Sequence, residues 1–488
     1  MRISVSAGIV FAALLAFAGG DASGQDSKPS SRPDAARRKS DAAFKRAELA
    51  RRLIHAESAW ADAALPARRS GIPLINDAMF AYFAGTIGDA ALALDRATGV
   101  LEGASTPAAW DAASGIRLST YLFDPATTEV AITRVELYPS SKTPSDRRIE
   151  WLLAERTGGG AGFAQALSAE GPWPAVLGAP FAVRVAATFK GSFTVGLGDG
   201  GNPAASLQPF AIVSSMPGLS ERLAGLRTVL ESSGIRAAPV DVRATLRRRI
   251  EILESLSAGV APEAPTDGGA LLDATERLIE DAIAGSPWRR LSGDVVVATD
   301  DDGRETPVRL YLPPDQRPDE SLPLIVAVHG AGGSENMFFE AYDRGRLVRL
   351  AAERRYIVAA PLSSGVGPSP VERAVRIASA VRQVDPRRIA LVGHSMGSGV
   401  VLAAGRKSPE AYAAIAAISG NGRPPKALDD VPLFLASGAA DPLSRPSKSA
   451  ESRPKHRTGV YPDVEHVMIM NACLDDLFRF VSDAFAAR

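Results

Sequence analysis

The spacing of hydrophobic residues changes along the chain and divides it into regions. Over 44–99, apolar side chains recur every three or four positions, which predicts two or three amphipathic helices. Over 117–215 the spacing becomes two: in 183–197 apolar residues alternate mainly with Arg, Thr, Lys and Ser, and 132–138 and 148–153 resemble further strands. This alternation is typical of half-buried strands, so we expect a small β-rich domain here, resembling a sandwich.

A helical period returns over 242–256 and 271–284. The segment APEAPTDGG separates these two helices, and the second ends at Gly285, Ser286 and Pro287. We expect the main domain boundary at this second break.

After residue 291 the apolar runs become short and continuous. Two strands flank a hairpin signal at Asp302 and Gly303, and the runs LIVAVHG, YIVAAP, RIALVGHSMG, YAAIAAISG and VPLFLASGAADP follow in series. Helical patterns at 344–353, 371–381 and 398–406 separate them. Continuous apolar strands are covered on both faces, so this alternation of strands and helices predicts an α/β domain with a doubly wound, mostly parallel sheet.

The first residues have the pattern of a secretory signal peptide. Arg2 precedes an apolar run over 5–18, and small residues offer cleavage after Ala18 or after Gly24. The run is shorter than the ~20 residues that a bilayer span needs, although an uncleaved membrane anchor is the competing interpretation. We expect an exported protein, periplasmic or secreted, without a stable membrane span once the signal is removed.

Composition excludes several function classes. With 55 Lys and Arg residues against 55 Asp and Glu residues, the 488-residue chain has no net charge that would attract it to nucleic acid. The single cysteine, Cys473, excludes an intramolecular disulfide framework and a zinc site built from cysteines.

The strongest chemical signal is a G-x-S-x-G motif at 393–397. It follows the strand pattern RIALV directly and precedes the helical pattern SGVVLAAG, which is the strand-to-helix context that a nucleophile elbow requires. A Cβ at either flanking position would clash where the chain reverses, so glycine is needed there. Ser395 is therefore the candidate nucleophile.

A serine nucleophile needs a base, and the base needs an acid that orients it. The chain has five histidines, and His466, in a loop before the last helix, is the candidate base; His456, in a basic polar run, is the alternative. Asp441 directly follows the strand VPLFLASG and is the candidate acid. Its local rivals, Asp463 and Glu465, are expected to be exposed loop residues.

An oxyanion hole is expected at the segment HGAGG over 329–333, which follows the strand LIVAV. The backbone N–H of Ala331, with Gly332 as its neighbour, is the candidate for one donor, and the N–H of Met396, the residue after the serine, is the other. The segment lacks the pattern of a nucleotide-binding P-loop.

These motifs make residues 290–488 resemble the α/β-hydrolase superfamily. The segments HGAGGS, DPRRIALVGHSMGSG, GAADP and EHV are most similar to its exported esterases, such as the polyhydroxybutyrate depolymerase and feruloyl esterase group, with prolyl-oligopeptidase-like hydrolases close by. The resemblance implies Ser395 as nucleophile, Asp441 as acid and His466 as base, with no cofactor and no metal. It departs at the polar segment between Asp441 and His466, where related enzymes usually carry a helix and a last strand.

The expected division of the chain combines these signals. It runs: signal peptide 1–24, disordered leader 25–41, helical region 42–115, β-rich domain 116–216, helical region and linker 217–287, and α/β-hydrolase catalytic domain 288–488.

The expected function is hydrolysis of carboxylic esters through an acyl-enzyme. Only about a dozen residues separate the strands AAIAAISG and VPLFLASG, where lids are usually inserted, so an open site for a bulky or polymer-attached ester is expected. The residues upstream are expected to act as a cap or as a substrate-binding module. A prolyl-oligopeptidase-like peptidase and a non-catalytic binding protein are the alternatives.

Overall fold

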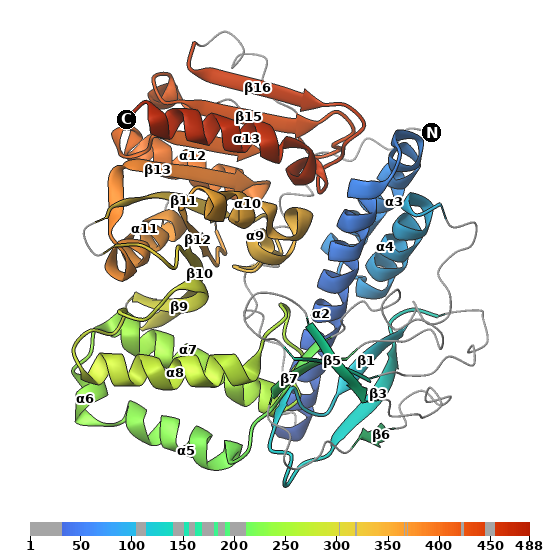
Figure 1. The fold of residues 1–488 in the computed structure, drawn as a ribbon. Helices are drawn as coiled ribbons and strands as arrows, with labels where there is room; N and C mark the ends of the chain where they lie inside the picture. Colours follow the sequence, from blue (N-terminus) through green and yellow to red (C-terminus); the bar gives the residue numbers. More distant parts are fainter. Residues whose placement is uncertain are drawn as a thin grey trace, which may run out of the picture.

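Figure 1 shows the chain as a computed structural model, which describes residues 32–103, 114–139, 151–155, 162–167, 180–183, 191–195, 211–301, 303–317, 320–365, 367, 369–420, 424–444 and 454–488. The expected signal peptide over 1–24 lies outside these residues. Within them, no helix combines the length and the apolar character that crossing a membrane requires.

An eight-stranded sheet organises the C-terminal domain, in the order β16-β15-β14-β13-β11-β12-β10-β9. Its strands are β9 (Gly293–Asp301), β10 (Arg304–Leu312), β11 (Leu322–Val328), β12 (Ile357–Pro361), β13 (Val384–His394), β14 (Ala414–Ile418), β15 (Leu433–Gly438) and β16 (His456–Tyr461). All pairs from β11 to β16 are parallel, whereas β9 and β10 form an antiparallel hairpin whose second strand pairs with β12. The predicted mostly parallel sheet is thereby confirmed.

Helices cover both faces of this sheet (Figure 1). They are α9 (Met337–Glu340), α10 (Tyr342–Glu353), α11 (Ser369–Val381), α12 (Met396–Lys407) and α13 (Ile469–Ala486), with short 3-10 turns η1 (Pro409–Ala411) and η2 (Lys426–Leu428). Successive residues of β11 face opposite sides: Ile325 joins the core under α10 and α13, while Leu324 and Val326 join the core under α11 and α12. Two-sided burial explains why the strand is apolar throughout.

Three helices form an N-terminal layer beside this domain: α2 (Arg32–Asp62), α3 (Leu65–Phe83) and α4 (Ile87–Leu101). Their apolar residues do not form a separate core. Trp60, Ile75 and Leu101 belong to the same buried cluster as Phe338 and Tyr342 of the C-terminal domain. We call α2, α3 and α4 the helical layer.

The expectation of a disordered leader over 25–41 is wrong for residues 32–41, because α2 begins at Arg32. This segment has no apolar period, which is what suggested disorder. It is nevertheless rich in Ala, Arg and Lys, which favour helix, and Pro33 lies in the first turn, where a missing N–H costs little. The Asp41 carboxylate also pairs with the Arg117 guanidinium at 2.7 Å.

The described strands of the middle region form two smaller sheets. One has the order β1-β3-β6, with β1 (Ser114–Leu118), β3 (Val130–Glu136) and β6 (Pro180–Val183). The other has the order β2-β8-β7-β4-β5, with β2 (Leu122–Phe123), β4 (Trp151–Glu155), β5 (Gly162–Leu167), β7 (Gly191–Val195) and β8 (Ala211–Ser215). Within the expected strand pattern at 183–197, residues 184–190 and 196–197 lie outside the described residues.

Helices α5 (Leu219–Leu230), α6 (Ser233–Arg236), α7 (Val240–Ser257) and α8 (Gly268–Ile283) complete the chain between these sheets and β9. Helix α7 is tied directly to the C-terminal sheet. The Thr245 hydroxyl accepts a hydrogen bond from the Ala298 N–H at 2.9 Å, and the buried Arg249 guanidinium donates to the Val296 carbonyl at 3.1 Å. The region before residue 288 is thus attached to β9 through successive turns of α7.

Candidate active site

The turn from β13 to α12 holds Ser395 in a strained backbone conformation. Its φ is 55° and its ψ is −117°, outside the common regions for a residue with a side chain. Glycines make this turn possible: a Cβ at Gly393 would collide with the Gly397 carbonyl, and one at Gly397 would collide with the Val328 carbonyl. The sequence therefore folds here as the elbow that the motif predicted, with the half-buried serine at the carboxyl end of the sheet.

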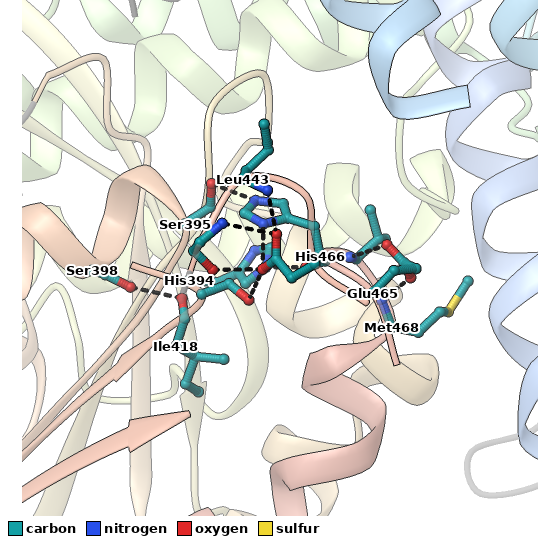
Figure 2. A network of polar contacts seen from close by, with 12 residues as sticks. His394, Ser395, Ser398, Ile418, Leu443, Glu465, His466 and Met468 are labelled. Carbon is teal, nitrogen blue, oxygen red and sulfur yellow. Dashed lines mark hydrogen bonds and ion pairs between the residues drawn. The ribbon is translucent and has the colours of Figure 1, made fainter. Parts of the chain in front are cut away.

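The structure brings Ser395, His466 and Asp441 into one chain of hydrogen bonds; Figure 2 shows Ser395 beside His466. The His466 Nε2 atom lies 2.8 Å from the Ser395 Oγ, and its Nδ1 atom lies 2.9 Å from the Asp441 Oδ2. Asp441 follows β15, two strands from the elbow strand, and His466 precedes α13. Three segments far apart in the sequence thus meet at one edge of the sheet.

Asp441 is held as an ionised acceptor. Its Oδ2 also accepts from the hydroxyls of Ser419 at 2.7 Å and Ser444 at 2.5 Å, while its Oδ1 accepts from the N–H groups of Leu443 and Ser444. Burial would raise the pKa of this carboxyl, but the hydrogen bonds from His466, Ser444 and Ser419 outweigh it and lower the pKa to about 2. An ionised carboxylate only accepts, so the His466 Nδ1 carries the hydrogen and its Nε2 is free to accept from the serine hydroxyl.

His394, the residue before the serine, fixes the position of His466 through the backbone. Its Nε2 lies 2.9 Å from the His466 carbonyl, and its Nδ1 lies 2.8 Å from the Tyr342 hydroxyl. A carbonyl only accepts, so Nε2 donates to it and Nδ1 accepts from the tyrosine. Burial lowers the pKa of His394 to about 3, which keeps the ring neutral and suited to both bonds.

The loop over 329–333 lies against the elbow. A Cβ at Gly330 would be 3.0 Å from the Ser395 Cβ, so glycine allows this close approach. The His329 Nε2 accepts from the Ser363 N–H at 3.0 Å, so its Nδ1 carries the hydrogen and donates to the Gly330 carbonyl at 2.8 Å. Burial lowers the pKa of His329, which favours the neutral ring that this arrangement needs.

The helical layer holds the same loop from the other side. The Arg46 guanidinium of α2 donates to the Gly332 carbonyl at 2.9 Å, and the Tyr82 hydroxyl of α3 donates to it at 3.0 Å. Gly332 has a φ of 75°, and a Cβ there would collide with the Tyr82 ring.

Among the described residues, no backbone carbonyl accepts from the N–H of Ala331 or Met396, and both residues line a cavity at the elbow. Both N–H groups are therefore available to a ligand.

The rival residues have other positions. His456 lies on β16, where its Nε2 is 3.0 Å from the Leu428 carbonyl, and Asp463 pairs with Arg69 of α3 at 2.9 Å. Glu465 was expected to be exposed, which is wrong: it is fully buried and accepts from the N–H groups of Val467 and Met468. Its carboxylate thereby closes the turn that carries His466, and burial raises its pKa to about 7.

The sequence did not indicate that Ser419 and Ser444 bind Asp441, or that His394 and its partner Tyr342 position His466. Ser419 directly follows β14, and parallel strands present their carboxyl ends at one edge, so its place next to Asp441 was a usable signal. Tyr342 had no such signal, because it reaches His394 from α10 across the face of the sheet.

These features define an α/β domain with a serine, a histidine and an aspartate joined at its carboxyl edge. Residues 325–486 match the model of the family described as "Alpha/beta hydrolase family", and the C-terminal domain is accordingly an α/β-hydrolase domain, as its motifs predicted. A comparison with curated proteins gave no match.

Solved structures similar to this chain include a thermostable esterase, 24% identical with a TM-score of 0.34, over 40% of this chain and 62% of that one. The chain thus matches less than two thirds of that esterase. A feruloyl esterase module from Clostridium thermocellum is 13% identical with a TM-score of 0.34, over 40% of this chain and 89% of that one. An S-formylglutathione hydrolase from Agrobacterium tumefaciens is 14% identical with a TM-score of 0.33, over 40% and 97%.

Proposed function

We propose that the protein is a serine hydrolase that cleaves carboxylic esters through an acyl-enzyme. The observation that supports this most directly is the pair of distances, 2.8 and 2.9 Å, that links Ser395 to His466 and His466 to Asp441. In this proposal Ser395 is the nucleophile, His466 the general base and acid, and Asp441 the residue that orients the imidazole.

The first half-reaction forms the acyl-enzyme. The Ser395 Oγ bonds to the carbonyl carbon of the ester while its proton passes to the His466 Nε2. The carbonyl oxygen becomes an oxyanion, which the N–H groups of Ala331 and Met396 stabilise. The carbon–oxygen bond to the alcohol then breaks, and the proton on His466 goes to the departing alcohol oxygen.

The second half-reaction restores the enzyme. A water molecule bonds to the acyl carbon as His466 removes one of its protons, and the same two N–H groups stabilise the second oxyanion. The bond to the Ser395 Oγ breaks, and the proton returns to that oxygen. The products are one carboxylic acid and one alcohol, and these steps use no cofactor or metal.

The test compares the wild type with Ser395→Ala on aryl esters and on dipeptide anilides. We expect ester turnover by the wild type and a loss of roughly 10³-fold or more in kcat for the variant. A fluorophosphonate probe should label the wild type at Ser395 and leave the variant unlabelled.

Two outcomes contradict the proposal. Turnover of anilides without turnover of esters indicates the peptidase, and a folded wild type that neither turns over esters nor reacts with the probe indicates a binding protein. Ser398→Ala is the matched control, because Ser398 is buried on α12 and its hydroxyl lies 2.9 Å from the Gly393 carbonyl and 2.7 Å from the Ile418 carbonyl, away from the Ser395 hydroxyl's partner His466. It should retain labelling. Export and polymer attachment of the substrate stay predictions.

A further inference from the structure

A cavity of about 170 Å³ opens beside Ser395 and His466, between the α/β-hydrolase domain and the helical layer. Most of its apolar wall comes from the layer rather than from the domain that contains the serine. The layer's apolar lining residues are Leu49, Ala50, Leu53, Ile54, Ile75, Ala78, Met79, Phe83, Ala90 and Leu94. Figure 1 shows the three helices, in blue, along the side of the domain.

The walls and the size of this cavity restrict what it holds. Its surface is largely apolar, so transfer of an apolar group from water into it is favourable. A cavity of ~150 Å³ lined by apolar side chains accommodates a benzene ring. A cavity of about 170 Å³ therefore suits an apolar group of about that size, such as a chain of four to six carbons.

A second cavity, of about 1620 Å³, adjoins the first and has a different character. The two share the loop residues 331–333 together with Arg46 and Tyr82 of the helical layer. The larger cavity is lined in addition by many charged residues, among them Arg248, Glu251 and Asp294. The small apolar space at Ser395 thus adjoins, through the loop over 331–333, a larger space whose lining includes charged side chains.

We propose that the helical layer forms the acyl-binding pocket of the enzyme, and that the pocket selects esters of apolar acids with about four to six carbons. This rests on the proposed function. The two spaces are assigned by the order of events: the alcohol leaves in the first half-reaction, whereas the acyl group stays on the Ser395 Oγ until water removes it. The group that stays belongs in the small apolar pocket at Ser395, and the group that leaves belongs in the larger adjoining cavity.

The test fills the pocket from the helical layer. Ala78→Leu adds three carbons to a buried wall position on α3, and Leu53→Phe enlarges a half-buried wall position on α2 that tolerates the change more readily. The matched control is Ala61→Leu, an exposed position of α2 that lines neither cavity. Circular dichroism and thermal unfolding establish that each variant is folded.

The substrates are p-nitrophenyl esters of acetate, butyrate and hexanoate, and acetate esters of alcohols of increasing size. We expect wild-type kcat/KM to rise about tenfold or more from acetate to butyrate or hexanoate. Each filling variant should reduce kcat/KM for hexanoate at least tenfold and for acetate less than threefold. Ala61→Leu should match the wild type on every ester.

The ester assays separate the pocket assignment from the proposed function. If the wild type hydrolyses no ester, the proposed function is wrong. If it hydrolyses acetate and longer acyl esters equally well, or if folded variants lose acetate and hexanoate turnover to the same degree, the pocket assignment is wrong and the esterase stands. If the filling variants discriminate among alcohols instead, the pocket binds the leaving group and the assignment is overturned.

Discussion

The helical layer and the α/β-hydrolase domain contribute different things to one site. The domain supplies every side chain in the hydrogen-bonded chain from Ser395 to Asp441, whereas the layer supplies no group of this chain. The layer instead supplies apolar walls and two hydrogen bonds to the Gly332 carbonyl. The difference suggests that the reaction and the choice of substrate are carried by separate parts of the chain, so changes in the two should have separable effects.

The largest expected effect lies in the domain. Asp441→Asn replaces an acceptor that holds the hydrogen on the His466 Nδ1, so the ring would adopt the wrong tautomer, and kcat on an aryl ester should fall about 10⁴-fold. Asp463→Asn is the matched control, because this acid pairs with Arg69 instead. A loss of less than tenfold for Asp441→Asn would show that the acid is supplied elsewhere.

A second effect concerns stability and tests whether the layer and the domain share one core. Trp60 is 2% exposed, within the cluster that joins α2 to the domain, so Trp60→Ala should cost about 3–5 kcal/mol in the free energy of unfolding. Leu65→Ala, at a position 48% exposed, should cost far less. Chemical denaturation measures both free energies of unfolding. An unchanged denaturation midpoint for Trp60→Ala would mean that the helical layer and the α/β-hydrolase domain do not unfold as one unit.

A third effect is the dependence of stability on pH at the contact between the two parts. Glu57 of α2 is fully buried, with Asp343 and Glu465 nearby, and burial is the main cause that raises the pKa of its carboxyl to about 8. The unfolded chain releases this proton near pH 4.5, whereas the folded chain keeps it to about pH 8. Between pH 4.5 and about 8, unfolding therefore releases this proton. The free energy of unfolding falls over this range as pH rises, by on the order of 1 kcal/mol per pH unit.

Glu57→Gln should reduce that slope between pH 5 and 8, and Asp62→Asn, at an exposed position of the same helix, should preserve it. Urea denaturation at a series of pH values measures the slope. An identical slope for wild type and Glu57→Gln would mean that Glu57 is ionised in the folded protein. Glu465, with a pKa raised to about 7, contributes a similar slope over a narrower range and remains in both variants.

The smallest effect is expected where the layer touches the loop over 329–333. Tyr82→Phe removes one of the two hydrogen bonds from the layer to the Gly332 carbonyl and leaves the ring in place. A hydrogen bond of this kind contributes roughly 1 kcal/mol, so kcat should fall about fivefold with KM nearly unchanged. A change in KM alone would indicate that Tyr82 contacts the substrate rather than positioning the loop.

The strands and the elbow were predictable because their signals are local. Each buried strand is a short apolar run, and Gly393, Ser395 and Gly397 occur between a strand and a helix. The candidate acid followed from its place directly after a strand, and the candidate base from its place in the loop before the last helix.

What the sequence did not reveal is how the parts pack together. The apolar face of α3 predicted a buried helix, but an amphipathic pattern does not say which surface covers it, so the pocket beside Ser395 was not foreseeable. The roles of His329 and His394 were hidden for the same reason, because their partners Ser363 and Tyr342 are distant in sequence.

The shared core also affects how the protein is made. Leu101, at the end of α4, leaves the ribosome long before Met468, which belongs to the same buried cluster. At synthesis rates of ~5–20 residues per second, this delay is on the order of 20–70 s. Until Phe338 and Tyr342 are made, the apolar faces of α2, α3 and α4 have no partner from this cluster's C-terminal part, and the cover is complete only after Met468. Helices α2, α3 and α4 are thus made early and fully covered late, and the nascent chain depends on whatever shields their apolar faces until α13 arrives.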